Sequence, residues 1–193
     1  MKRTGLFGGS FDPIHLGHTM LAEEAKVSAS LDQVLFIPCR QSPHKDEAPG
    51  ASDEQRCEMI RLAIADFPWA EVSTVELERE DPSYSWQTAQ YFAGRDPDAE
   101  LFWILGSDQW DVIEKWANPA VLAELLTFLV FPRGSEVNAK PGFRHHFVQH
   151  AHPASATKVR NARSDAKQFL APKVFDFVEK EGLYWEPTQT GKS

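Results

Sequence analysis

Residues 5–18 read GLFGGSFDPIHLGH, and the predicted fold is built around these residues. It opens as an apolar strand, turns through residues 8–10, crosses residues 11–13 and enters a helix. His15 and His18 share one face of that helix, because residues three apart are helical neighbours. Glycines let backbone N–H groups approach a phosphate, and the first turn of a helix has unpaired N–H donors and a partial positive charge. The stretch therefore predicts an anion site where a strand meets a helix.

Two common phosphate motifs are excluded. The segment lacks Gly-x-x-x-x-Gly-Lys-Ser/Thr, so it is no P-loop, and its glycines do not fit Gly-x-Gly-x-x-Gly. The alternative is an ordinary strand–helix turn whose histidines pack or cap. The combination of two imidazoles with glycines and a Ser-Phe-Asp-Pro turn favours the phosphate site.

Length and composition indicate an ordinary globular protein. The 193 residues are 42% hydrophobic and 25% charged, which fits one domain, expected over residues 1–185, with residues 186–193 as a disordered tail. The net charge of −8 argues against a nucleic-acid partner. The apolar run 125–131 is too short to cross a membrane and no signal-peptide core precedes the first strand, so we expect no membrane partner and a cytoplasmic location. Cys39 and Cys57 lack metal-ligand spacing and are expected to be buried or free thiols.

Apolar runs and helical patterns alternate along the chain. This alternation predicts an α/β protein with a Rossmann-like, doubly wound, mainly parallel sheet flanked by helices, and a small helical part at the C-terminal end. The expected strands after the first are 33–39, 71–77, 101–105, 126–131 and 145–150. The expected helices are 17–29, 52–67, from 83 or 85 to 93, one after Asp108 that contains Trp110 and Trp116, one from 119, one from about 155, and 172–182.

Polar and basic residues follow several of these strands. Ligands of open parallel sheets bind at strand carboxyl ends, so Asp108 is well placed for a ribose hydroxyl, although it could simply cap a helix. Ser85 could likewise be a cap, and Lys45 could lie on a solvated surface loop. Trp110 and Trp116 have the spacing of a helical face, which is usually core, although one of them could line a ring pocket.

A second phosphate site is predicted near the C-terminal end. Ser155 and Thr157 offer hydroxyl groups at a helix start, and Arg160 lies one turn later on the same side as Thr157. If both elements bind one polyphosphate, they must lie close together in the folded chain.

Five stretches together resemble the bacterial nicotinate/nicotinamide mononucleotide adenylyltransferase family, which belongs to the nucleotidyltransferases with a His-x-Gly-His motif. The closing Val178–Tyr184 segment also matches. The five stretches are residues 8–18, the loop from Pro38 to Lys45, residues 82–88, residues 106–108 with Trp116, and residues 155–160.

The resemblance implies transfer of an adenylyl group from ATP to a pyridine mononucleotide, with release of pyrophosphate. Magnesium would be bound through the ATP phosphates rather than by protein ligands. The implied catalytic residues are His15, His18 and Arg160. The implied ATP-binding residues are Gly8, Gly9, Ser10, Phe11, Gly106, Asp108, Ser155 and Thr157, and the implied mononucleotide-binding residues are Lys45, Ser85, Trp116 and Arg133.

Three positions depart from the family pattern. Ser85 stands where threonine is usual, Gln87 replaces an acid, and Ala117 stands where an aromatic residue is usual, so the preference between nicotinate and nicotinamide stays open. The alternatives are a related enzyme that acts on pantetheine phosphate or a sugar phosphate, and a nucleotide-binding regulator without activity. The sequence also leaves the oligomeric state open, including a homo-oligomer.

Overall fold

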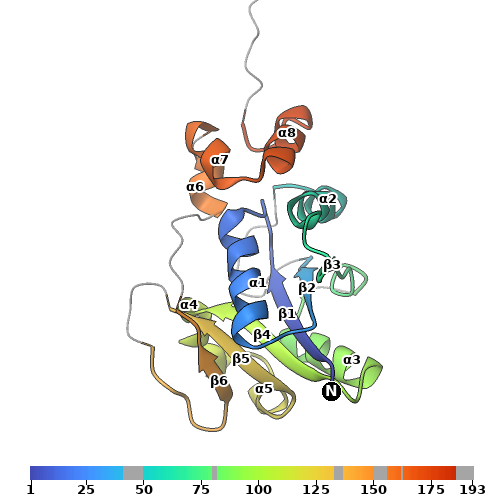
Figure 1. The fold of residues 1–193 in the computed structure, drawn as a ribbon, viewed down its shortest axis with the longest axis vertical. Helices are drawn as coiled ribbons and strands as arrows, with labels where there is room; N and C mark the ends of the chain where they lie inside the picture. Colours follow the sequence, from blue (N-terminus) through green and yellow to red (C-terminus); the bar gives the residue numbers. More distant parts are fainter. Residues whose placement is uncertain (41–49, 80–81, 133–136, 150–155, 162, 186–193) are drawn as a thin grey trace, which may run out of the picture.

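The computed structural model describes residues 1–40, 50–79, 82–132, 137–149, 156–161 and 163–185. Its described strands form one sheet in the order β3-β2-β1-β4-β5-β6, and every neighbouring pair is parallel. The strands are β1 (Arg3–Gly9), β2 (Gln33–Pro38), β3 (Ala70–Val72), β4 (Glu100–Gly106), β5 (Leu126–Phe131) and β6 (Arg144–Phe147). The predicted Rossmann-like α/β fold is confirmed (Figure 1).

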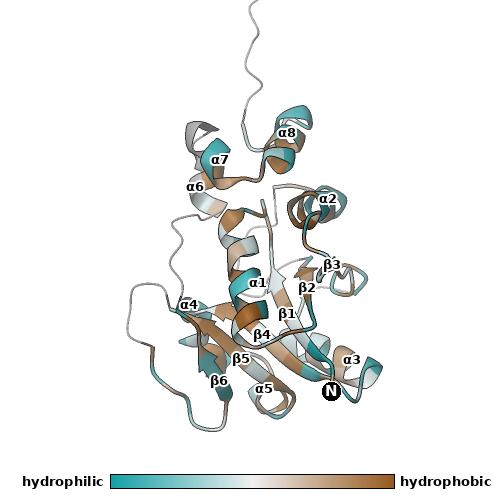
Figure 2. Cartoon of the chain, viewed as in Figure 1, coloured by the Kyte–Doolittle hydropathy of each residue, from teal (hydrophilic) through white to brown (hydrophobic). Residues whose placement is uncertain are grey.

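Helices cover both faces of this sheet. Phe7, Phe36 and Ile104 pack with α1 (Leu16–Ser28) and α2 (Asp53–Ile64) in one core cluster. The alternate residues, such as Leu6 and Trp103, pack on the other face in a second cluster. That face is covered by α3 (Ser85–Arg95), α4 (Ser107–Trp110), the 3₁₀ turn η1 (Ile113–Lys115) and α5 (Pro119–Leu125). Burial on both faces explains why β2, β4 and β5 are largely hydrophobic in Figure 2.

The strand order reverses direction beside β1. The chain steps outward from β1 to β2 and β3, and then returns to the other side of β1 through β4. At such a switch point the connections leave the carboxyl ends of the two central strands in opposite directions, which opens a crevice for a ligand. The first motif of the sequence lies at the carboxyl end of β1.

Three short helices form the C-terminal part, as predicted. They are α6 (Ala156–Asn161), α7 (Arg163–Phe169) and α8 (Pro172–Lys180), and they lie beyond the start of α1, with α8 next to α2 (Figure 1). Val174 and Val178 of α8 are buried in the same core cluster as α1 and α2. Within the described segments, no helix has the length and apolar character needed to cross a bilayer.

Two expected elements differ in the structure. The strand expected at residues 71–77 ends at Val72, and the chain then turns so that Val75 and Glu76 are both buried. Trp116 does not continue the helix of Trp110, because α4 has only 4 residues and Trp116 has extended backbone angles after η1. Trp110 is therefore fully buried, whereas Trp116 is only partly buried.

Glu76 is the centre of a buried polar network at the carboxyl end of the sheet. Its side chain accepts a hydrogen bond of 2.7 Å from Thr88 Oγ1 and a second one from the Ser83 hydroxyl group. The backbone N–H of Arg40 donates in turn to Ser83 Oγ at 3.3 Å. The network thus joins the end of β2, the turn after β3 and the start of α3. Burial raises the pKa of Glu76, although Thr88, Arg79 and Ser83 each lower it.

We predict that Glu76→Gln changes the pH dependence of stability. Because the folded-state pKa lies above the ordinary value of 4.5, the contribution of Glu76 to stability is greatest below that value and is lost as the pH rises through the folded-state pKa. The variant should therefore gain stability relative to the wild type as the pH rises from about 4.5 towards neutral, by about 1.4 kcal/mol for each unit by which the pKa is raised.

Urea unfolding across this range measures the difference. Glu71→Gln, at an exposed position of β3, is the control and should give a nearly constant difference. A constant difference for Glu76→Gln as well would contradict the raised pKa.

Candidate active site

The two histidines of the first motif form the corner between β1 and α1. His15 is the N-cap of α1, and its backbone N–H donates to His18 Nδ1 at 3.2 Å. The two imidazole rings stack with centroids 3.7 Å apart and an angle of 19° between their planes. Because Nδ1 of His18 accepts a hydrogen bond, the neutral ring carries its hydrogen on Nε2. His18 can thus present a donor to an anion at the start of the helix.

Phe11 supports this corner from behind. Its ring is 2% exposed and meets the ring of His18 edge-on, with centroids 5.0 Å apart. A second edge contact, at 5.5 Å, joins Phe11 to Phe7 of β1. The backbone of Phe11 has φ 46°, a left-handed conformation that is uncommon for a bulky residue. Phe11 therefore fixes the orientation of His18 from the core.

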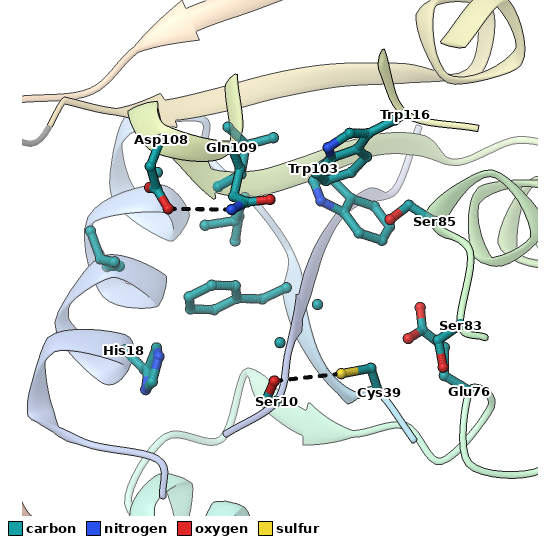
Figure 3. Close-up of a pocket in the computed structure, with 17 residues that line it drawn as sticks. Ser10, His18, Cys39, Glu76, Ser83, Ser85, Trp103, Asp108, Gln109 and Trp116 are labelled. Atoms are coloured by element: carbon teal, nitrogen blue, oxygen red, sulfur yellow. Dashed lines mark hydrogen bonds between the residues drawn. The ribbon is translucent and has the colours of Figure 1, made fainter. Parts of the chain in front are cut away.

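A pocket of about 300 Å³ opens at the carboxyl ends of β1 and β4. Figure 3 shows that it lies on both sides of the end of β1, with His18 and Asp108 on one side and Trp116, Ser85 and Glu76 on the other. Of the predicted site residues, it brings together Gly8, Gly9, Ser10, His18, Ser85, Gly106, Asp108 and Trp116. One side therefore offers an imidazole and a carboxylate, and the other, which we call the aromatic side, combines two tryptophans with Ser83, Ser85 and Glu76.

The aromatic side is built by two tryptophans from different elements. The rings of Trp103 in β4 and Trp116 meet edge-on, with centroids 6.4 Å apart and an angle of 84°. A Cβ atom on Gly8 would lie 3.0 Å from the Trp103 ring, so the glycine is needed there for packing as well as for backbone access. This arrangement leaves room for a flat ring beside β1.

Asp108 and Ser85 could each cap a helix on sequence grounds, but neither is the N-cap of its helix. Asp108 lies in the first turn of α4, whose N-cap is Gly106, and accepts a hydrogen bond of 3.3 Å from Gln109. Ser85 is the first residue of α3, whose N-cap is Tyr84. Both side chains therefore line the pocket without serving as caps.

Arg160 reaches the first motif from the other end of the chain. Its Nη1 donates to the main-chain oxygen of Asp12 at 2.6 Å, across 148 residues of sequence. The two elements predicted to bind phosphate therefore lie close together at this contact, as expected.

Thr157 is exposed in the first turn of α6. The predicted residues Lys45, Arg133 and Ser155 lie outside the described residues.

Sequence reasoning missed several residues that line the pocket. They are Cys39, Glu76, Ser83, Trp103 and Gln109. Cys39 follows β2 directly, so the rule that ligands bind at strand carboxyl ends could have identified it.

Cys39 and Cys57 are buried free thiols, as expected. In the chain segments that the structure covers, no group of three or more His, Cys, Asp or Glu side chains is arranged to hold a metal ion.

Comparison with known proteins agrees with this geometry. Residues 6–162 match the model of the cytidylyltransferase-like family. A probable nicotinate-nucleotide adenylyltransferase of Methylacidiphilum infernorum is 46% identical over 133 residues, which are 69% of this chain and 65% of that protein. The alignment thus spans less than two thirds of that relative. The nicotinate-nucleotide adenylyltransferase of Bacillus subtilis is 35% identical over 197 residues, covering 95% of this chain and 99% of that one.

A solved structure shows the same fold at much lower identity. The nicotinic acid mononucleotide adenylyltransferase of Plasmodium falciparum, complexed with NaAD, superposes with a TM-score of 0.81. It is 18% identical, and the match covers 95% of this chain and 98% of that one. The pocket at the switch point, the motif at its edge and the full-length match to the Bacillus protein lead to one conclusion: the chain belongs to the cytidylyltransferase-like family and, within it, to the nicotinate-nucleotide adenylyltransferases.

Proposed function

We propose that this chain joins the AMP part of ATP to nicotinate mononucleotide, giving the dinucleotide and pyrophosphate in NAD biosynthesis. The observation that carries the proposal is the single pocket on both sides of the end of β1, with His18 and Asp108 on one side and the two tryptophans on the other. Such a site can hold two ligands so that they meet at the glycines between them. The family of the chain supports this assignment.

ATP occupies the side with His18 and Asp108 in this proposal. The backbone of Gly8, Gly9 and Ser10 lies along the nucleotide, and Asp108 accepts from the ribose. His15, His18 and Arg160 contact the phosphates, together with Thr157 and Ser155. The contact between Arg160 and Asp12 supports this placement, because it puts the guanidinium beside the turn that leads to the histidines.

The reaction needs little from the protein besides alignment and charge. A phosphate oxygen of the mononucleotide is already ionised near neutral pH, so it can attack the α-phosphorus without a general base. The bond to the α-phosphorus forms as the bond to the leaving pyrophosphate breaks. The Nε2–H of His18 and the guanidinium of Arg160 stabilise the negative charge that develops on that leaving group.

Magnesium enters this proposal with ATP. It supplies neutralisation of the phosphate charges when bound. The imidazole and guanidinium groups proposed for the phosphates suit phosphate oxygens better than they suit Mg²⁺, which prefers oxygen ligands. The carboxylate of Asp12 in the same motif accepts hydrogen bonds from Gly50, Ala51 and Tyr184. The residues present therefore fit an ion that is held by the nucleotide phosphates.

The mononucleotide occupies the aromatic side. Trp116 stacks on the pyridine ring, Ser85 offers a hydroxyl group, and Lys45 and Arg133 are proposed for its phosphate or carboxylate. The sequence-based expectations of a cytoplasmic location and of no nucleic-acid or membrane partner stay predictions.

A pyrophosphate-release assay tests the function. With ATP and magnesium, we expect release and stoichiometric dinucleotide formation with nicotinate mononucleotide, and little or none with pantetheine phosphate. Nicotinamide mononucleotide in a parallel reaction gives the preference between the two pyridines. Release with pantetheine phosphate alone would show a different acceptor, and ATP binding without release would support a regulator.

His18→Asn tests the proposed catalytic role of His18 Nε2. The asparagine side chain can replace Nδ1 as an acceptor for the backbone of His15, but it lacks a group at the position of Nε2. We expect kcat to fall about 100-fold or more while the unfolding midpoint changes little, since one donor to a developing charge contributes about that much. His146→Asn, on an exposed residue of β6, should keep both properties. Wild-type turnover in His18→Asn would remove this residue from the mechanism.

Trp116→Ala tests the aromatic side. Loss of ring stacking should raise KM for the mononucleotide about tenfold or more, because one aromatic stacking contact on a base contributes about 1–3 kcal/mol. KM for ATP serves as the internal control and should stay within about twofold. Equal increases in both KM values would contradict separate sides for the two substrates.

A further inference from the structure

Three donors from two distant parts of the chain converge on the carboxylate of Asp12. The backbone N–H of Gly50 donates to Oδ2 at 2.8 Å, and that of Ala51 donates to Oδ1 at 3.2 Å. The hydroxyl group of Tyr184 donates to Oδ1 at 2.5 Å, from a position 172 residues away. Asp12 is 7% exposed. An acid within the phosphate motif is thus bound by its own set of protein donors.

Tyr184 is suited to be a lasting donor in this cluster. Burial raises the pKa of its phenol, and the hydrogen bond and charge of Asp12 raise it further, so the hydroxyl group keeps its hydrogen at neutral pH. Hydrogen bonds between a neutral donor and a buried carboxylate are among the stronger ones in proteins. The bond therefore fixes the C-terminal segment to the first motif.

The next residue, Trp185, contacts Arg160. Trp185 Nε1 donates to the main-chain oxygen of Arg160 at 3.2 Å, while the guanidinium of Arg160 donates to the main-chain oxygen of Asp12. Tyr184, Asp12, Arg160 and Trp185 thus form a closed ring of contacts. Both the backbone and the side chain of Arg160 are held by this ring.

We propose that Tyr184 and Trp185 form a C-terminal clasp that positions Arg160 against the phosphate motif. The inference rests on the proposed function, because it assigns the clasp to the step in which pyrophosphate leaves. Both are positioning residues, since neither is among the described residues that line the pocket. An arginine side chain has many rotamers, so fixing it on the phosphates costs conformational entropy. The ring of contacts already fixes Arg160, which reduces this cost when ATP binds. The clasp also fixes Gly50 and Ala51, whose backbone N–H groups donate to the same carboxylate.

Tyr184→Phe in the full-length chain tests the clasp. The change keeps the ring and removes only the hydroxyl group that donates to Asp12. We expect kcat/KM for ATP to fall about tenfold, measured well below the unfolding temperature. The same change in an Arg160→Ala background should cost less than about twofold, because the residue that the clasp positions is then absent. Trp185→Phe removes the indole N–H and should act in the same direction.

Tyr91→Phe is the matched control. It removes the same hydroxyl group from an exposed position on α3 and should leave kcat/KM unchanged. A general loss of stability in Tyr184→Phe would lower activity by the same factor in both backgrounds, and that result would overturn the proposal. Wild-type kcat/KM in Tyr184→Phe would overturn it as well.

Amide hydrogen exchange gives a readout that needs no activity. In Tyr184→Phe, the amides of Gly50 and Ala51 should exchange several times faster than in the wild type, while Tyr91→Phe leaves them unchanged. Unchanged exchange in Tyr184→Phe would overturn the clasp. A wild-type chain that forms no dinucleotide would refute the proposed function, and exchange at these two amides would still decide whether the clasp exists.

Discussion

The hydrogen bond from the guanidinium of Arg160 to the main-chain oxygen of Asp12 is the constraint on which the site depends. The sheet alone places the first motif at the carboxyl end of β1, but it does not fix the short C-terminal helices. The bond closes a chain segment of 148 residues, and the loop entropy this costs must be offset by burial elsewhere. Val174 and Val178 of α8 provide that burial in the core cluster they share with α1 and α2.

The charged groups around the first motif hold one another in place. The chain carries a net charge of −8, and two arginines contact the backbone of this motif while the carboxylates of Asp12 and Asp53 lie beside them. Arg56 is fully buried; it donates to the main-chain oxygen of Ser10 at 2.7 Å and pairs with Asp53 at 2.5 Å. Removing such a cation from water costs free energy, and this cost is offset only when the cation is paired with an anion. The positive groups behind the motif are thus held in place before any anion binds.

Local patterns predicted most of the fold and part of the site. The apolar run 126–131 became β5 with the same limits, since a fully buried parallel strand has a distinct composition. The alternation at residues 71–77 predicted one long strand, which is wrong because the strand ends at Val72. Glu76 is buried there, and its hydrogen bonds come from Thr88 and Ser83, which lie in a later segment. The ring of Phe11 packs behind His18, and a contact of Phe11 with ATP stays a prediction. The Asp12 cluster depends on Gly50, Ala51 and Tyr184, so no local pattern could predict it.

The Glu76 network bears on how an acidic protein can accept an anionic pyridine. Glu76 lines the same side of the pocket as Trp116, and an ionised carboxylate there would repel a second carboxylate. Two hydroxyl groups donate to Glu76, and its raised pKa favours the neutral form over a wider pH range. Burial favours the uncharged carboxyl group, whereas the two hydroxyl groups stabilise the ionised form and partly offset its charge. Because Ser83 also accepts from the backbone of Arg40, the residues that screen Glu76 hold the end of β2 and the start of α3 together. Electrostatic screening and the shape of the acceptor side therefore depend on the same hydrogen bonds.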